Sequence, residues 1–357
     1  MTARPEPSPR ELDDPLTRAL AVLARGGRLG EGLVADAFGL LMSGEALPTR
    51  AAALLMGLRV QGESGAELAG AARAMRAVMR RVELPASLTV VDTAGTGGGT
   101  IPTFNVSTAA AFVVAAAGVP IAKHGNRSYT SRCGSADVLE ALGIDLARAG
   151  EHVAHLLTSV GVAFLFAPAF HPAMRHVAPV RRELAIATIM NLVGPLANPA
   201  QVRRQLVGVG DAERGPVVAD ALRRLDAEHA LVVHGIVGMD EVAPHGETLV
   251  WEVRHDDVRT WTLDPASYHL DQPDLGALRG GEPAENAARI TRLLDRPADD
   301  PEGRAATILN AGLAVYAGGT VATPKEGIGR AAEALDDGRA AGVLAAFRQA
   351  VGISTSE

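Results

Sequence analysis

Residues 88–117 read LTVVDTAGTGGGTIPTFNVSTAAAFVVAAA, and this stretch decides the fold class. Its first four residues are mostly β-branched, which predicts a short strand at 88–91. A glycine-rich segment follows at 95–99, and the alanine- and valine-rich run at 107–117 predicts a buried helix. Strand, glycine-rich loop and helix in this order are typical of an α/β unit with a parallel sheet.

Further strands and helices continue this alternation downstream. Strands are predicted at 120–122, 162–166, 206–209 and 231–234. A helix is expected at 217–225, so we predict a mostly parallel sheet. Residues 249–253 and 258–263 read as a hairpin joined by a polar turn, which is appended to that sheet. Helices are expected to close the chain at 284–295, 303–317, 324–336 and 339–350.

The segment before the first strand has a different period. From Asp14 to Val82 apolar residues recur at helical spacing, which predicts four helices and a small all-α unit. Ser64 and Glu67 have the spacing of a capping box, so we expect the fourth helix to begin there. The proline-rich N-terminus lacks the apolar core of a signal peptide and is expected to be a tail. The predicted domains are therefore a flexible tail at 1–14, a helical domain at 15–84 and a larger α/β domain at 85–350.

Length and composition narrow the class of protein. The chain has 357 residues, of which 47% are hydrophobic, so two domains are expected. Its single cysteine, Cys133, excludes an internal disulfide framework and fits the cytoplasm. The net charge of −7 disfavours nucleic acid as a partner. The longest apolar run, 106–122, contains Gly118 and Pro120, so we expect a buried helix and a strand rather than a membrane span.

The first group of residues that can carry chemistry is the glycine-rich loop. It joins Gly95–Gly99 to a helix start that bears Thr103, Asn105, Ser107 and Thr108. Glycines let backbone N–H groups approach an anion, and a helix N-terminus adds donors and partial positive charge. The loop lacks the spacing of a P-loop or of a dinucleotide site. A phosphate cradle is the functional interpretation, and a plain turn is the alternative.

The second group follows the predicted strand at 120–122. Lys123, His124, Gly125, Asn126, Arg127 and Ser128 are predicted to form a loop at the carboxyl end of that strand, and the polar character continues through Ser131, Gly134 and Ser135. Open α/β sheets bind ligands at such ends, and two cations with an amide and hydroxyls suit phosphate and pyrophosphate oxygens. A solvated basic loop is the alternative.

Two further groups are weaker when taken alone. Asp240 and Glu241 follow the predicted strand at 231–234, where adjacent carboxylates can hold Mg²⁺ that also binds substrate phosphates. Solvated acids are the alternative. His171 and Arg181 form the last group, in which a buried arginine would clamp a carboxylate, although most arginines lie on the surface.

Together these segments resemble the anthranilate phosphoribosyltransferase family, within the fold shared with pyrimidine nucleoside phosphorylases. The resemblance extends from about Leu16 to Leu344, over segments in a fixed order: Gly44-Glu45, Gly62-Glu63, Asp92–Gly98, Lys123–Arg127, Gly134–Gly143, Phe170–Met174, Asn191–Pro199, Val232–Glu241, Asn310-Ala311 and Glu326-Gly327. It implies a helical domain packed against an α/β domain, with the active site between them. It also implies that part of 171–200 returns to the helical domain, and that the protein is a homodimer through that domain.

The resemblance also implies the reaction and the roles of single residues. The enzyme would transfer the 5-phosphoribosyl group from phosphoribosyl pyrophosphate to the amine of anthranilate in tryptophan biosynthesis, with Mg²⁺ as cofactor. Gly95 would border both substrates. Phosphoribosyl pyrophosphate would be lined by Gly98, Gly99, Thr103, Asn105, Val106, Ser107, Thr108, Lys123, His124, Gly125, Asn126, Arg127, Ser128, Tyr129, Thr130, Ser131 and Ser135. Ser107, Asp240 and Glu241 would coordinate Mg²⁺. Asn126 and Arg181 would contact anthranilate, His171 is a further substrate-binding candidate, and His124 is the candidate catalytic residue.

Two departures from the family pattern stand in these segments. The family usually has an acid where this chain has Gly99, and Gly-x-Arg-Thr where it reads Ala185-Ile186-Ala187-Thr188. One polar contact near the ribose and the metal is therefore missing, and so is one cation beside the helical domain. A nucleoside phosphorylase and a non-catalytic binding protein on the same scaffold are the alternative interpretations. The acidic pair disfavours the first, and the two departures favour the second.

Overall fold

The computed structural model describes residues 14–128 and 132–352, and the chain divides into two compact units. The smaller unit holds the described residues up to Met79 together with His171–Ala197, and the larger unit holds Arg80–Phe170 and the described residues from Asn198 onward. Of the predicted site, Tyr129, Thr130 and Ser131 lie outside the described residues, and so does nearly all of the predicted tail.

The smaller unit is entirely helical. Its helices are α1 (Pro15–Leu23), α2 (Glu31–Ser43), α3 (Pro48–Gln61), α4 (Gly65–Val78), α10 (Met174–Leu184) and α11 (Ile189–Val193), followed by the 3₁₀ turn η1 (Gly194–Leu196). Phe38, Leu54 and Leu68 are fully buried between the helices. The predicted capping box is confirmed, since the Ser64 N–H donates to Glu67 Oε2 at 2.8 Å and the Glu67 N–H donates to Ser64 Oγ at 3.2 Å. Sequence periodicity therefore predicted this unit well.

The larger unit is built on one seven-stranded sheet with the order β3-β2-β1-β4-β5-β6-β7. The strands are β1 (Val91–Gly95), β2 (Ile121–Gly125), β3 (Val162–Phe166), β4 (Arg204–Gly208), β5 (His229–Gly235), β6 (Thr248–Arg254) and β7 (Asp257–Leu263). Strands β1 to β5 are parallel, and β6 and β7 add an antiparallel hairpin. The predicted fold class, a small helical domain and a larger α/β domain with a mostly parallel sheet, is confirmed.

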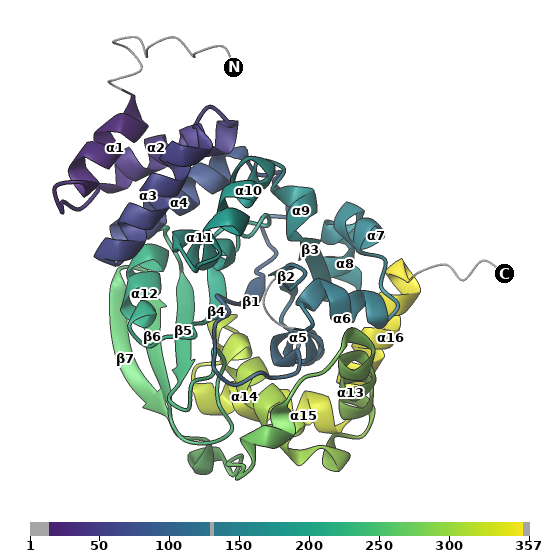
Figure 1. Ribbon diagram of the computed structural model, residues 1–357. Coiled ribbons are helices and arrows are strands. Elements are labelled where there is room, and N and C mark those ends of the chain that lie inside the picture. The colour runs from purple at the N-terminus through teal and green to yellow at the C-terminus, as the bar shows by residue number, and fades with distance from the viewer. Residues whose placement is uncertain (1–13, 129–131, 353–357) are drawn as a thin grey trace. The chain divides into compact units, whose positions relative to one another are not determined.

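Helices surround the sheet and build the main core. They are α5 (Val106–Ala116), α6 (Ser135–Ala141), α7 (Leu146–Glu151), α8 (Val153–Ser159), α9 (Ala167–Phe170), α12 (Arg214–Arg224), α13 (Pro283–Asp295), α14 (Pro301–Ala317), α15 (Pro324–Asp336) and α16 (Arg339–Val351), with 3₁₀ turns η2 (Pro265–Tyr268), η3 (Leu275–Leu278) and η4 (Pro297–Asp299). Figure 1 shows α5 beside α14 and α15, with which it packs. Helix α14 is buried from Ala305 to Ala317, and most of these residues are apolar, as expected for a helix in the middle of a core.

The strands that lead to the site end later than the sequence predicts. Strand β1 was expected at 88–91 but spans 91–95, and β2 was expected at 120–122 but spans 121–125. The prediction that Lys123, His124 and Gly125 lie in a loop is therefore wrong. Glycine, lysine and histidine have low strand propensity, but here neighbouring parallel strands supply hydrogen-bond partners, with Gly95 paired to Gly208 and Gly125 to Phe166.

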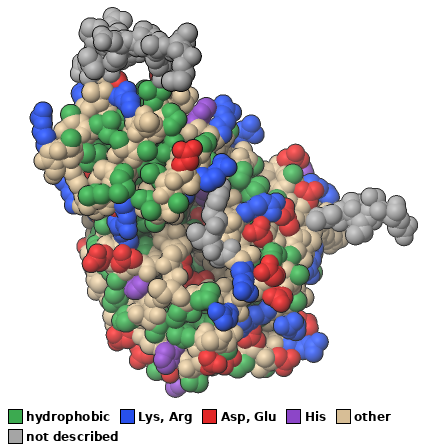
Figure 2. Space-filling model, viewed as in Figure 1, with side chains coloured by type: hydrophobic (Ala, Val, Ile, Leu, Met, Phe, Trp, Pro, Cys, Tyr) green, Lys and Arg blue, Asp and Glu red, His purple; other side chains and the backbone are tan. Residues whose placement is uncertain are grey.

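The surface of the larger unit carries both signs of charge. On the face shown in Figure 2, acidic and basic side chains are interspersed over this unit. No helix within the described part of the chain is both long and apolar enough to cross a membrane.

Candidate active site

The strand order places a switch point between β1 and β4. From β1 the chain first builds β2 and β3 on one side of it, then returns to build β4 and β5 on the other. In open α/β sheets the crevice at such a point, outside the carboxyl ends of the strands, is the usual ligand site. Here that position is marked by the pair Gly95 and Gly208, the last residues of β1 and β4.

The glycine-rich loop lies directly against the loop that carries the acidic pair. The Thr100 N–H donates to the Gly238 carbonyl at 2.8 Å. A Cβ atom added at Gly99 would lie 2.7 Å from Asp240 Oδ1, and one added at Gly208 would overlap the Asp240 carbonyl oxygen. At Gly208 only glycine permits this approach, whereas a side chain at Gly99 would require the Asp240 carboxylate to move.

Asp240 and Glu241 are half-buried and both carboxyls resist ionisation. Burial raises the pKa of Asp240, and burial together with repulsion from Asp240 raises the pKa of Glu241. Thr103 Oγ1 donates to Glu241 Oε2 at 3.0 Å, which ties the acidic pair to the segment before α5. A cation at this position would offset the repulsion between the two carboxylates.

The donor set fits magnesium. Within residues 14–128 and 132–352, no three His, Cys, Asp or Glu side chains gather as a group that could hold a metal. Mg²⁺ is usually held by one or two carboxylates together with substrate phosphates and waters, rather than by an all-protein cage. Glu241 accepts from the Ser107 backbone N–H and Asp240 lies against the glycine-rich loop, so the carboxylate pair matches that pattern.

Lys123 links β2 to strand β1 and to the start of helix α5. Its Nζ donates to the Thr93 carbonyl at 2.5 Å and to Ser107 Oγ at 3.2 Å. Only 3% of Lys123 is exposed, and burial lowers its pKa to about 8, against the attraction of Asp92 and Glu241. The amine therefore holds the end of β1 to the first turn of α5.

Asp92 attracts Lys123 and is fully buried. It accepts hydrogen bonds from the His124 N–H at 3.1 Å and from Asn198 Nδ2 at 2.8 Å. Burial raises the pKa of Asp92 to about 6, although Lys123 and these donors oppose the shift. The carboxylate thus fixes the backbone of β2 at the residue before Gly125.

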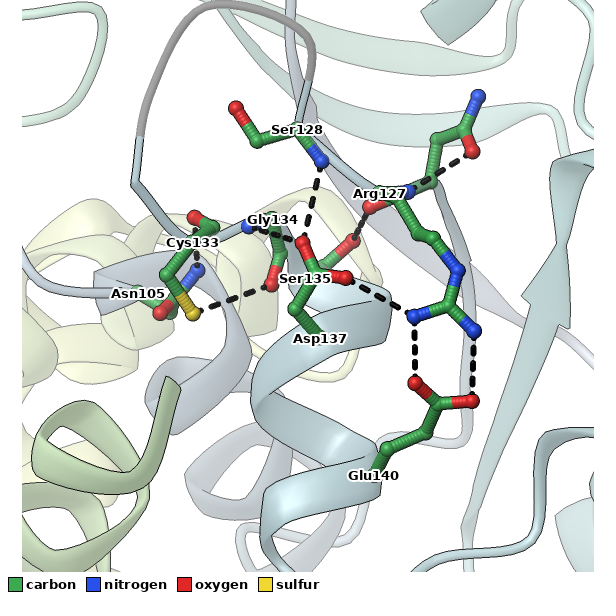
Figure 3. A network of polar contacts seen from close by, with 9 residues as sticks. Asn105, Arg127, Ser128, Cys133, Gly134, Ser135, Asp137 and Glu140 are labelled. Carbon is green, nitrogen blue, oxygen red and sulfur yellow. Dashed lines mark hydrogen bonds and ion pairs between the residues drawn. The ribbon is translucent and has the colours of Figure 1, made fainter. Parts of the chain in front are cut away.

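Beyond β2, Arg127 turns toward helix α6 (Figure 3). Its guanidinium donates to Asp137 at 3.0 Å and to both oxygens of Glu140 at 2.5 and 2.7 Å. Asp137 also accepts from the N–H groups of Ser128 at 3.2 Å and Gly134 at 2.8 Å. The Asp137 carboxylate therefore holds Ser128 and Gly134 together. The role of Arg127 as a phosphate ligand stays a prediction.

The remaining predicted residues of this unit surround these contacts. Val106 and Thr108 are buried in the first turn of α5, with 0% and 1% exposed. The Asn126 carbonyl accepts from Ser135 Oγ at 3.3 Å, which brings Ser135 to the end of β2. Gly98 has φ +89°, a conformation that favours glycine.

His171 and Arg181 belong to the smaller unit. His171 is buried, and burial lowers its pKa to about 4. Arg181 lies in the last turn of α10 and is half-buried. Ala185 ends that helix at φ 52°, in the left-handed region that glycine adopts without strain. The departure from the usual glycine at this position therefore costs backbone strain.

Sequence reasoning missed the buried polar residues that hold these segments. Asn310 of α14 accepts from the Val242 N–H and donates to the Val242 carbonyl, next to Glu241. Asn198 holds Asp92, and Asn286 of α13 contacts Asn105. Each lies more than 65 positions from its partner, so no local spacing signals the contact.

Comparisons with known proteins agree with this arrangement. Residues 17–79 match the model of the glycosyl transferase family, helical bundle domain, and residues 87–341 match that of the glycosyl transferase family, a/b domain. The anthranilate phosphoribosyltransferase of Thermomicrobium roseum is 49% identical over 308 residues, which cover 85% of this chain and 88% of that protein.

Two solved structures extend the similarity to the fold. The crystal structure of anthranilate phosphoribosyltransferase from Thermus thermophilus is 42% identical with a TM-score of 0.86, covering 94% of this chain and 99% of that one. The Saccharomyces cerevisiae enzyme in complex with phosphoribosyl pyrophosphate and Mg is 29% identical with a TM-score of 0.84, covering 94% and 97%.

Proposed function

This chain belongs to the anthranilate phosphoribosyltransferase family, and from that premise we propose how its residues hold and activate the substrates. The enzyme transfers the 5-phosphoribosyl group of phosphoribosyl pyrophosphate to the amine of anthranilate, giving N-(5-phosphoribosyl)anthranilate and pyrophosphate, in tryptophan biosynthesis. The observation that carries our assignment of the site is the meeting of glycine-rich loop, α5 N-terminus and acidic pair at the switch point of the sheet.

We assign the phosphates of phosphoribosyl pyrophosphate to the glycine-rich loop and the start of α5. Gly98 and Gly99 leave backbone N–H groups open to approach, and the helix start adds partial positive charge. Ser107 and Thr103 supply hydroxyls beside Lys123 and Glu241. Positive and neutral donors on one side and carboxylates on the other suit a diphosphate that arrives with a divalent cation.

The acidic pair and Ser107 would hold Mg²⁺. When bound, this ion neutralises charge on the departing pyrophosphate. The raised pKa values of Asp240 and Glu241 support the assignment, because two like carboxylates in one half-buried place are stabilised by a cation.

The chemistry needs stabilisation of the leaving group more than a strong base. Bond breaking at the anomeric carbon runs ahead of bond making, because the ring oxygen shares the positive charge, as in glycosyl transfer generally. Fixed donors of the glycine-rich loop and α5 receive the charge that develops on pyrophosphate. The aromatic amine of anthranilate is neutral at pH 7, so it attacks without prior deprotonation.

We assign His124 the late removal or orientation of the amine proton, with Gly95 bordering both substrates. Support comes from the place of His124 at the carboxyl end of β2, where Asp92 fixes its backbone. Asn126, Arg181 and His171 are assigned to anthranilate, with Arg181 as the partner of its carboxylate.

Anthranilate fluorescence tests the assignment of the reaction and the metal. The purified chain should consume anthranilate only when phosphoribosyl pyrophosphate and Mg²⁺ are both present. Consumption that continues in excess chelator would remove Mg²⁺ from the assignment. Absence of consumption with both present would remove the substrate assignment.

Replacing Arg181 tests the acceptor site. Arg181→Ala should raise the anthranilate KM roughly 10-fold, the loss of about 1.5–3 kcal/mol for a charged hydrogen bond, and leave the KM for phosphoribosyl pyrophosphate unchanged. The exposed neighbour provides a matched control, since Arg182→Ala should change neither constant. An unchanged anthranilate KM in Arg181→Ala would end this assignment.

We also propose that the protein is a cytoplasmic homodimer through its helical domain. Of the seven large hydrophobic side chains that are exposed in the described structure, five lie in the smaller unit: Leu47, Met56, Val60, Val78 and Ile186. Hydrophobic side chains also gather over α1–α4 on the face seen in Figure 2. Exposed apolar area of this kind is typical of an interface. Sedimentation equilibrium should give a dimer mass for the wild type and a lower mass for Val60→Asp.

A further inference from the structure

Asn286 is a buried asparagine near the start of α13 that no feature of the proposed reaction uses. Only 4% of it is exposed. Its Nδ2 donates to Asn105 Oδ1 at 2.9 Å, although 181 positions separate the two residues. Its Oδ1 accepts from the Gly281 N–H at 2.8 Å. Asn286 therefore joins the segment before α13 to the residue that precedes α5.

Asn105 continues the chain of amides to the loop beyond β2. Its Nδ2 donates to the Cys133 carbonyl at 3.2 Å, as Figure 3 shows. The series thus runs from the Gly281 N–H through the amides of Asn286 and Asn105 to the Cys133 carbonyl. Three segments that are remote in the sequence are held by two side chains.

The two backbone groups at the ends of this series determine how both amides are oriented. A backbone N–H can only donate, so Asn286 must present its oxygen to Gly281 and its nitrogen to Asn105. A carbonyl can only accept, so Asn105 must present its nitrogen to Cys133 and its oxygen to Asn286. Rotation of either amide by a half turn would bring two donors or two acceptors together at both of its contacts.

Helix α13 makes a second contact with the same segment. Arg289, three residues after Asn286, holds its guanidinium 4.3 Å from the centre of the Phe104 ring. The side chain of Arg289 is itself fixed by Asp300, at 2.7 and 2.8 Å. The Phe104 N–H donates to the Leu278 carbonyl at 2.8 Å, so Phe104 and Asn105 are both held by the segment from η3 to α13.

Fixing Asn105 fixes a donor beside the glycine-rich loop. The Nδ2 group carries two N–H bonds, and the contact with Cys133 uses one of them. The other is held in a set direction at the start of α5, where the proposed phosphate site lies. Without Asn286, the contact with Cys133 alone would orient the Asn105 amide, so the direction of its second N–H would be held less tightly.

We propose that Asn286 is a positioning residue of the transfer reaction, which acts through Asn105 on the binding of phosphoribosyl pyrophosphate. This inference rests on the proposed function. It adds to that function a residue of the C-terminal helices that touches no substrate.

The test is a double-mutant cycle of Asn286→Ala and Asn105→Ala, with steady-state constants for both substrates. Asn286→Ala should raise the KM for phosphoribosyl pyrophosphate about 10-fold, as loss of a residue that orients a ligand typically does, and change the anthranilate KM less than about twofold. In the Asn105→Ala background the same change should alter the KM for phosphoribosyl pyrophosphate less than about twofold, because the residue through which Asn286 acts is gone.

A second variant keeps the shape of the side chain. Asn286→Asp retains the acceptor for the Gly281 N–H but replaces the donor to Asn105 with an oxygen. It should raise the KM for phosphoribosyl pyrophosphate at least as much as Asn286→Ala. The control is Glu285→Ala, which removes the hydrogen bond to the Glu282 N–H at the same helix start and should leave both KM values unchanged.

Several outcomes would overturn the proposal. They are an equal effect of Asn286→Ala with and without Asn105, an unchanged KM in both Asn286 variants, and an equal effect of Glu285→Ala. Loss of the folded state in both variants would assign Asn286 to folding and overturn it too. A wild type that consumes no anthranilate would instead contradict the proposed function, so the two failures are distinguishable.

Discussion

Near the two ends of strand β5, a glutamate lies in a polar cluster, and the two clusters differ in character. Beyond the carboxyl end of β5, Glu241 lies next to Asp240. Burial and repulsion from Asp240 raise the pKa of Glu241. Glu252, on β6, lies beside His229 at the amino end of β5, and burial alone would raise the pKa of Glu252. Hydrogen bonds from His229, Arg254 and other donors outweigh burial and lower the pKa to about 2.

The difference lies in the number of donors. Glu252 has four partners at 2.7 to 2.9 Å, which are His229, Arg254, Trp261 and Tyr316. For Glu241, one side-chain donor, Thr103, stands against a second carboxylate. A buried charge with many donors stabilises the fold, whereas two neighbouring carboxylates that repel each other are typical of a site that a ligand completes. The donors around Glu252 are therefore typical of a structural cluster, whereas the surroundings of Glu241 fit the proposed metal site.

The largest expected effect separates the Glu241 cluster from the Glu252 cluster by activity. Asp240→Asn should lower kcat/KM roughly 1000-fold, because Mg²⁺ loses a ligand and the pyrophosphate charge is no longer neutralised. The melting temperature without Mg²⁺ should stay the same or rise, since one of two repelling carboxylates is gone. The matched control is the exposed acid Glu247, and Glu247→Gln should change kcat/KM less than about twofold. A fall in melting temperature with retained activity would reverse the assignment.

Glu252→Gln should show the opposite pattern. The variant should lose about 3 kcal/mol of unfolding free energy, because an amide nitrogen replaces one carboxylate oxygen and faces donors that lose their acceptor. Urea unfolding measures this loss, and kcat/KM of the folded fraction should stay within about twofold. Asp257→Asn on the neighbouring strand, which breaks an exposed ion pair with Arg259, should cost less than about 0.5 kcal/mol.

A smaller effect on activity is expected from a substitution at Gly99, because an added side chain would crowd the Asp240 carboxylate without changing its charge. A Cβ atom there would lie 2.7 Å from Asp240 Oδ1, so Gly99→Ala must displace that carboxylate. The Mg²⁺ concentration for half-maximal activity should rise about 10-fold, as for other changes that disturb the orientation of a metal ligand. A glycine of α15 with open space around it is the control, and Gly329→Ala should leave the Mg²⁺ requirement unchanged.

The smallest effect is a pH dependence that belongs to Glu252. Its folded pKa of about 2 lies below its ordinary value of 4.5, so the stabilisation that it provides is complete above pH 4.5 and is lost as pH falls toward 2. The stability difference between wild type and Glu252→Gln should therefore shrink over that interval. Urea unfolding at pH 7, 4 and 3 measures it. A difference independent of pH would show that Glu252 is not the titrating group.

Local patterns were enough to predict most elements of the fold. Helical periodicity identified α1 to α4, and the short apolar run VAFLF identified β3 with its observed bounds, Val162–Phe166. The ends of β1 and β2 were missed because Gly95 and Lys123 lack strand propensity, and their pairing with β4 and β3 outweighs that deficit. The predicted loop at Lys123 became part of a strand for this reason.

In the candidate site, too, some features could be predicted from the sequence and others could not. Glycines, hydroxyls and an acidic pair next to strands and helix starts were visible in the sequence, because anion binding and metal binding require those residue types at such ends. That Arg127 pairs with Asp137 and Glu140 was not visible, since an arginine can reach many partners and only the fold selects one.

By itself, the amino-acid sequence determined the class of fold, the order of the proposed phosphate-binding segments and the chemistry proposed for them, because these depend on residue type and short-range spacing. The tertiary structure alone decided which residues hold those segments in place. Asn198, Asn286 and Asn310 act on partners 106, 181 and 68 positions away, and an asparagine in a helix or loop carries no local sign of such a partner. Contacts over that separation exist only after the sheet has brought the segments together.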